Sequence, residues 1–192
     1  DKSELGHEFA ARGAGCNPDL VDAAIDAGIP VDAETSSNPR QSFYESRQQP
    51  YPAKQTALAR LGSEYVFCKN GALRVATAKR LLERGADPNH QDINGQTPIY
   101  MEVDSIALLN VLLEHGADPQ HKDNKGISAI FSSMNKTIIL RLLKAGASPE
   151  GRYGPPPRAG VYDNTPHTLA EVALSYDMPD VTAWLKAHPA NQ

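Results

Sequence analysis

The chain has 192 residues, of which 40% are apolar and 6% aromatic, and it carries 19 Lys and Arg against 23 Asp and Glu. The apolar fraction suffices for a folded core, and the charge balance excludes the basic stripe expected of a nucleic-acid binder. The apolar runs are only a few residues long, so we expect no membrane-spanning segment. A globular or repeat protein remains.

Four glycines, Gly28, Gly85, Gly116 and Gly146, each follow apolar or small residues at constant offsets of eight, seven, four and three positions. These offsets form one face of a helix with 3.6 residues per turn. The glycine supplies the positive φ that ends such a helix. The four stripes are Leu20, Val21, Ala24 and Ile25; Thr77, Ala78, Leu81 and Leu82; Leu108, Leu109, Leu112 and Leu113; and Ile138, Ile139, Leu142 and Leu143.

Helix starts are marked by a hydroxyl residue followed by proline. Thr97-Pro98 and Thr165-Pro166 fit this pattern, because the hydroxyl accepts a hydrogen bond from a free amide and proline suits the first helical position. Thr56-Ala57 and Ser128-Ala129 are weaker versions. Each unit therefore consists of a turn, a helix, a short connection, a second helix and a glycine. Such units bury their stripes only by stacking on one another.

Two motifs recur along the chain. The segment ERGADPN at 83–89 returns as EHGADPQ at 114–120 and as KAGASPE at 144–150. Asp92-x-x-Gly95 returns 31 residues later as Asp123-x-x-Gly126. This pattern resembles the ankyrin repeat, whose opening D-x-x-G-x-T-P-L is similar to DINGQTPI at 92–99 and whose close is similar to LLEHGAD at 112–118. The resemblance is closest over 78–150 and faintest over 4–32.

The resemblance implies an all-α fold, an ankyrin-repeat solenoid of about five helix-turn-helix units with long loop insertions. We expect one domain over residues 1–192. The expected units cover approximately 4–32, 56–91, 92–122, 123–150 and 165–189, and the insertions cover 33–55, 62–71 and 151–164.

The insertions hold about a quarter of the residues but seven of the twelve aromatics. Tyrosine and arginine on loops held by a rigid scaffold dominate the binding energy of many interfaces. The alternative is that these rings pack back to order their own loops. The candidates for binding in the insertions are Phe43, Tyr44, Tyr51, Arg152, Tyr153, Arg158 and Tyr162.

Ankyrin-like arrays hold another protein with their turns and with the concave helix face. The resemblance therefore implies a second group of partner-binding residues in the third and fourth units. They are Ile93, Asn94, Gln96, Asp104, Ser105, Asn124, Lys125, Ile127, Asn135 and Lys136.

Motifs for catalysis are absent from the sequence: it has no nucleophile elbow, P-loop, dinucleotide fingerprint or zinc-protease helix. His90 and His121 take the same place in successive units, which repeat inheritance explains better than a shared metal ion. We therefore expect no enzyme, no metal and no cofactor. An enzyme with its site in the insertions, near Arg152, Tyr153 or His167, is the less favoured alternative.

Two cysteines are too few for a disulfide-rich scaffold. Cys16 lies between the two helices of the first unit, and Cys68 lies in the long connection of the second. Corresponding connections of adjacent units are neighbours, so a Cys16–Cys68 disulfide fits the geometry and would indicate an oxidising compartment. The alternative is two unrelated free thiols.

These features predict a non-catalytic protein-binding module. By analogy we favour a bacterial immunity or inhibitor protein that binds and neutralises a cognate secreted toxin or effector. The alternative is an ankyrin effector or scaffold that engages a host or regulatory protein. The chain begins at Asp1 without an initiator Met, which with the cysteines favours a periplasmic or otherwise exported protein over a cytoplasmic one.

Overall fold

The computed structural model describes residues 2–35, 54–62, 68, 70–101, 105–151 and 167–189. Within these ranges the chain forms nine α-helices, two 3-10 helices and no strand, which confirms the all-α prediction for them; Lys122 and Ser128 form an isolated bridge. The chain divides into two compact units, Asp1–Asp118 (unit 1) and Pro119–Gln192 (unit 2), and each is described by itself.

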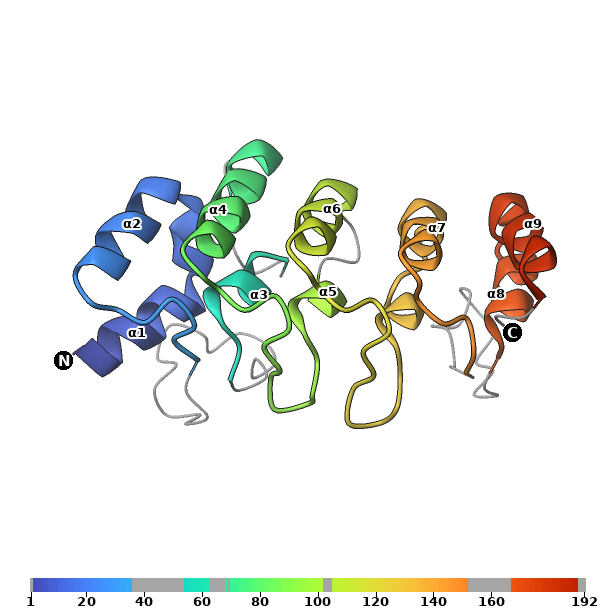
Figure 1. The fold of residues 1–192 in the computed structure, drawn as a ribbon, viewed down its shortest axis with the longest axis horizontal. Coiled ribbons are helices and arrows are strands. Elements are labelled where there is room, and N and C mark those ends of the chain that lie inside the picture. The colour runs from blue at the N-terminus through green and yellow to red at the C-terminus, as the bar shows by residue number, and fades with distance from the viewer. Residues whose placement is uncertain are drawn as a thin grey trace, which may run out of the picture. The chain divides into compact units, whose positions relative to one another are not determined.

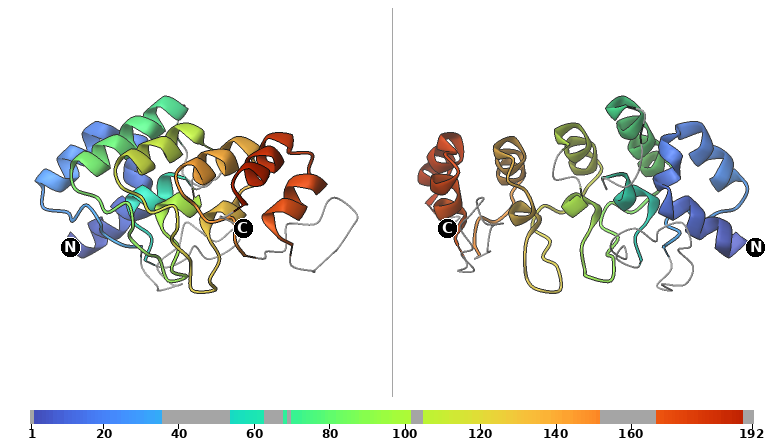
Figure 2. Two further views of the ribbon diagram at one scale, coloured as in Figure 1. Left: turned by 45° about the vertical axis from the view of Figure 1, so that its right-hand side comes forward. Right: turned by 180° about the vertical axis from the view of Figure 1, so that it is seen from behind.

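Unit 1 contains three pairs of helices (Figure 1). Helix α1 (Lys2–Ala11) is followed by the 3-10 turn η1 (Gly13–Cys16) and α2 (Pro18–Asp26); α3 (Ala57–Leu61) by α4 (Gly71–Glu83); and α5 (Pro98–Met101) by α6 (Ile106–Glu114). Helices α2, α4 and α6 lie side by side in one layer, and α1, α3 and α5 lie side by side in the other (Figures 1 and 2). Unit 1 is thus a two-layer stack of helix pairs.

Unit 2 contains the 3-10 helix η2 (Ala129–Ser132) followed by α7 (Lys136–Lys144), and the pair α8 (Leu169–Ser175) and α9 (Pro179–Ala187). Helix α7 packs against η2 and α9, and α8 packs against α9. The short apolar segment after Ser128 forms a single 3-10 turn rather than an α-helix. None of the helices in the described part of the chain is long and apolar enough to cross a membrane.

The predicted apolar stripes form most of the core. All four residues of the stripe on α4 and all four on α7 are buried. On α6, Leu108, Leu109 and Leu112 are buried and Leu113 is half-buried. The prediction for α2 was wrong at Leu20, which is 46% exposed, whereas Val21 is fully buried. Helix α2 ends its layer and packs on α4 alone within it, so only part of its stripe is covered.

The four predicted glycines lie just beyond the ends of α2, α4, α6 and α7, with φ of 87°, 91°, 88° and 100°. At the end of α4, the Ala86 amide donates to the Leu81 carbonyl and the Gly85 amide donates to the Leu82 carbonyl. This is the Schellman motif, which satisfies the last free carbonyls of a helix. The glycines therefore end these helices as the sequence predicts.

Helix α8 departs from the predicted boundaries. Thr165-Pro166 lies outside the described residues, and α8 begins at Leu169 with Thr168 as its N-cap in a capping box with Glu171. The helix ends without glycine: Asp177 takes φ 52°, and the Met178 amide donates to the Ala173 carbonyl at 2.8 Å. Aspartate tolerates this left-handed conformation better than most residues, so the same turn forms from a different sequence.

Substitution of two glycines by alanine measures how much backbone conformation alone contributes to stability. A Cβ added at Gly116 (φ 88°) or at the helical Gly71 would meet no atom within 4 Å. We expect Gly116→Ala to lower the free energy of unfolding by about 1–2 kcal/mol, because alanine is strained at positive φ. Gly71→Ala should raise it by up to about 1 kcal/mol, since alanine favours helices. Urea denaturation measures both, and equal effects would contradict the explanation.

Candidate functional site

The two predicted turns are built alike. In the first turn, the Asp92 carboxylate accepts from the Asn94 and Gln96 amides at 2.8 and 3.0 Å. In the second, the Asp123 carboxylate accepts from the Lys125 and Ile127 amides, both at 2.9 Å. Gly95 and Gly126 close the turns with φ of 74° and 75°. The recurring Asp-x-x-Gly motif therefore encodes one rigid backbone shape, used once in each unit.

The side chains that these turns present differ. Ile93 is 54% exposed and Asn94 is also exposed, whereas the equivalent residues of the second turn are the exposed Asn124 and Lys125. Gln96 and Ile127 are half-buried at equivalent places. The residues that hold the backbone are thus repeated, and those that face solvent are not.

Three other candidates lie at helix starts. Ser105 and Asn135 are N-caps that accept from the Leu108 and Thr137 amides at 3.3 and 3.0 Å, and Lys136 is exposed at the first position of α7. Capping therefore already accounts for the residue type at two of these positions. The remaining candidates, Phe43, Tyr44, Tyr51, Asp104, Arg152, Tyr153, Arg158 and Tyr162, lie outside the described residues.

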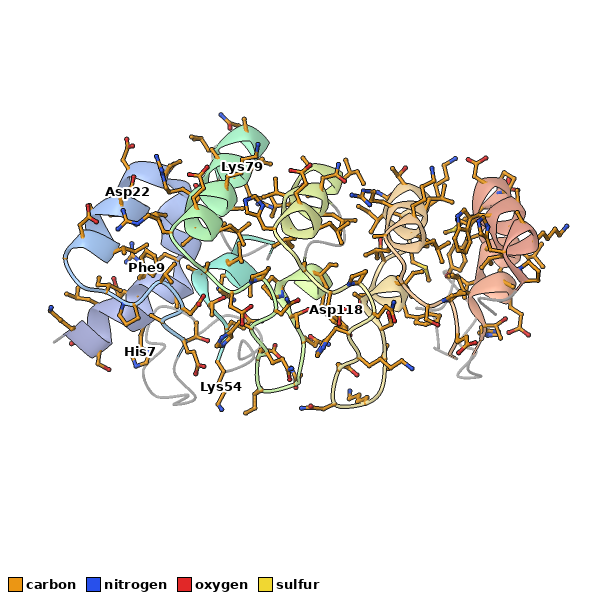
Figure 3. All side chains as sticks on the ribbon, in the orientation of Figure 1. His7, Phe9, Asp22, Lys54, Lys79 and Asp118 are labelled. Carbon is orange, nitrogen blue, oxygen red and sulfur yellow. A yellow bond between two sulfur atoms is a disulfide. The ribbon has the colours of Figure 1, made fainter. Side chains whose placement is uncertain are left out.

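Beside the first turn, the residues that flank the 36–53 segment are joined by hydrogen bonds between Thr35, Lys54 and Gln55. The Thr35 amide donates to the Gln55 carbonyl at 2.9 Å, and the Lys54 amide donates to the Thr35 carbonyl at 3.1 Å. The Gln55 amide donates to the Thr35 hydroxyl at 3.0 Å. We call residues 34, 35, 54 and 55 the stem. Figure 3 shows Lys54 and His7 at the same edge of unit 1 as the first turn.

A buried polar group that the sequence pattern does not reveal lies beneath this edge. Gln55, Arg60 and Asp92 are only 3%, 2% and 7% exposed. The Arg60 guanidinium lies 3.5 Å from the Gln55 side-chain oxygen, and the Gln55 side-chain nitrogen lies 3.5 Å from the Asp92 carboxylate. A buried charge needs such partners to be tolerated. The one available signal was an arginine inside the apolar run of α3.

Two histidines converge on Glu34 of the stem. His7 Nδ1 lies 2.6 Å from the Glu34 carbonyl oxygen, and His90 Nε2 lies 3.1 Å from the Glu34 carboxylate. The His90 contact does not count as a hydrogen bond, and it is an ion pair only when the imidazole is protonated. The contacts tie α1 and the loop after α4 to the stem.

The loops after α2, α4 and α6 are linked by one repeated contact. The Asp32 carboxylate accepts from the Asp87 amide at 3.1 Å, and the Asn89 side-chain oxygen accepts from the Asp118 amide at 2.8 Å. Asp32 and Asn89 each stand four residues after their glycine, and each holds the loop of the next helix pair. These loops therefore form a hydrogen-bonded edge along unit 1.

Asp32 gives this edge a pH dependence. Burial raises the pKa of its carboxyl, with a further rise from the Asp87 charge, against the lowering effects of the Asp87 amide and of His90. A carboxyl whose pKa is higher in the folded protein adds stability as the pH falls through that pKa. Asp32→Asn keeps an oxygen for the Asp87 amide, so we expect it to be at least as stable as the wild type at pH 7. Its advantage should disappear toward pH 3 in chemical denaturation, and a less stable variant at pH 7 would contradict this.

The predicted cysteine pair is close in space: Cys16 and Cys68 stand at disulfide distance, with Cα atoms 5.4 Å apart. Cys16 is buried and takes φ 51°, the left-handed region that favours glycine. The pair links η1 to the segment that precedes α4, as the spacing of the two connections predicts.

In unit 2, a cavity of about 340 Å³ lies between the chain after α7 and helices α8 and α9. Glu150 is the one titratable residue among its described lining residues, which are Pro149, Glu150, Gly151, Thr168, Leu169, Ala170 and Leu185. Among the residues with described positions, no group of three His, Cys, Asp or Glu side chains is arranged to hold a metal ion.

Charge is distributed unevenly between the units. Unit 1 carries 11 Lys and Arg against 17 Asp and Glu, whereas unit 2 carries 8 against 6. Neither a scan against protein-family models nor a search of curated proteins finds a match to this sequence.

Proposed function

We propose that this chain is a non-catalytic protein-binding module whose helix pairs form an ankyrin-repeat solenoid. The glycine-ended helices, the two layers of unit 1 and the repeated Asp-x-x-Gly turns support this assignment. The partner binds at the first turn of unit 1, residues 92–96, where backbone held by Asp92 presents side chains to solvent.

The observation that carries the proposal is the exposure of Ile93. Its turn is held by two hydrogen bonds to a buried carboxylate, so the isoleucine reaches solvent on a preorganised scaffold. An exposed branched apolar side chain gains little in the free protein. Against a partner it offers area to bury at a small cost in chain entropy. The exposed side chains of the second turn differ in chemistry from those of the first, although the backbone is the same. This difference supports a role for the exposed residues in recognition rather than in folding.

The partner class that we favour is a secreted toxin or effector, which the module would neutralise as an immunity or inhibitor protein. The Cys16–Cys68 pair supports an oxidising compartment. The acidic balance of unit 1 favours a partner with a basic surface, because complementary charge steers association. Raised salt should then slow association.

Photocrosslinking in the source organism tests the binding edge. A photoreactive phenylalanine at position 93, in the first turn, should give a discrete adduct of one partner, identified by mass spectrometry. The same probe at position 125 tests the second turn, in unit 2, separately. The control position is Leu174 on α8, which is 69% exposed and distant from either turn in sequence. Adducts at all three positions alike, or no adduct at position 93, would contradict binding at the first turn. An inhibitor must also abolish the toxicity of the crosslinked partner on co-expression, whereas a scaffold would leave it unchanged.

A point variant gives the expected magnitude. With the crosslinked partner purified, Ile93→Ala should weaken binding by about 1–3 kcal/mol, the effect of truncating an interface anchor. The helical circular dichroism and the midpoint of unfolding should stay unchanged, because the side chain is exposed in the free protein. Isothermal titration calorimetry measures the affinity, and Leu174→Ala is the matched control with no expected effect.

A further inference from the structure

Gln55 contacts the stem through its backbone and the buried polar group through its side chain. Its backbone belongs to the stem of the 36–53 segment, where its carbonyl and amide both bond to Thr35. Its side chain extends away from the stem, and the residue as a whole is only 3% exposed. There the amide nitrogen approaches the Asp92 carboxylate and the amide oxygen faces the Arg60 guanidinium, each at 3.5 Å.

The two carboxylate oxygens of Asp92 have different partners. Oδ1 accepts from the amides of Asn94 and Gln96 and so fixes the first turn. Oδ2 faces Gln55, which belongs to the stem. Movement of the stem therefore disturbs the same carboxylate that shapes the turn. In a buried site such polar contacts are hard to replace, because water does not reach the groups that would lose them.

The backbone next to Gln55 is strained. Lys54 takes φ 66°, a conformation that non-glycine residues rarely adopt, and it does so at the point where the 36–53 segment returns to the fold. Such conformations are unfavourable and persist where the surroundings fix them, often at functional sites. Here the hydrogen bonds of Thr35 on one side and the buried side chain of Gln55 on the other hold the strained residue.

We propose that Gln55 is a positioning residue that couples the 36–53 stem to the 92–96 turn, so that the two open and close as one unit. The inference rests on the proposed function only in assigning this edge to partner binding. The coupling makes one rigid surface from the stem and a repeat turn that lie 37 residues apart at Gln55 and Asp92. A partner that orders either part then orders the other.

Amide hydrogen exchange of Gln55→Met tests the coupling. Methionine is similar in length and removes the side-chain contacts to Asp92 and Arg60 while leaving the backbone of residue 55 in place. We expect exchange at the Asn94 and Gln96 amides and at the Thr35 and Lys54 amides to accelerate at least tenfold, by similar factors. The amides of Lys125 and Ile127 in the second turn have the same local bonds and should change less than twofold. Gln91→Met, at an exposed neighbour of Asp92, should change none of them.

A second measurement needs no variant and covers the case in which Gln55→Met does not fold. In native-state exchange of the wild-type chain at low denaturant, amides of one cooperative unit share one opening free energy and one denaturant dependence. The stem and first-turn amides should follow a single curve. Separate curves, acceleration of only one set in the variant, or equal acceleration of the second turn would each overturn the proposal. None of these results involves a binding partner, so they stand apart from the test of the proposed function.

Discussion

Removal of the Cys16–Cys68 bond is expected to lower the free energy of unfolding by about 4 kcal/mol. The two residues are 52 positions apart, and closing a loop of that length restricts the unfolded chain by about this amount in the chain-entropy model, within a general range of about 2–5 kcal/mol. The whole 36–53 segment lies inside the loop. The bond therefore removes unfolded-state freedom from the part of the chain that has the longest insertion.

Urea denaturation of the Cys16→Ala/Cys68→Ala double variant measures this effect, with the wild type in the presence and absence of a reductant as reference. The reductant should destabilise the wild type by the same amount as the double substitution and leave the double variant unchanged. Mass spectrometry of alkylated protein counts free thiols in parallel. Two alkylated thiols in the protein isolated from its source, with no response to reductant, would show that the pair is not bonded there and would remove the argument for an oxidising compartment.

The helix ends were predictable because their signals are local. An apolar stripe followed by a glycine involves residues within about two turns, and each of the four glycines adopts the expected positive φ. Where the same turn forms without the signal, as at Asp177, the sequence pattern does not mark it. The exposure of Leu20 was missed for a different reason. A stripe predicts which face of a helix is apolar, but the neighbours that cover it depend on the stack.

The site was predictable only in its exposed part. The repeat pattern places Ile93 and Asn94, and their equivalents Asn124 and Lys125, on exposed turn positions, as the structure has them. That they bind a partner stays a prediction. The buried Gln55, Arg60 and Asp92 group could not be assembled from the sequence, because its members come from three segments and no periodicity links them. Long-range polar contacts leave no local pattern beyond a charged residue in an apolar run.

Leu112→Ala is expected to lower the free energy of unfolding by about 2–5 kcal/mol. Leu112 is fully buried on α6, which packs against α4 in its own layer and against α5 in the other. Truncation removes buried apolar surface and leaves a cavity that the surrounding helices fill only in part. Leu113→Ala is the matched control, because it makes the same deletion one residue along the helix at a half-buried position and should cost clearly less. If the two variants lose equal stability in urea denaturation, α6 is not held by the face that the stack of unit 1 assigns to it.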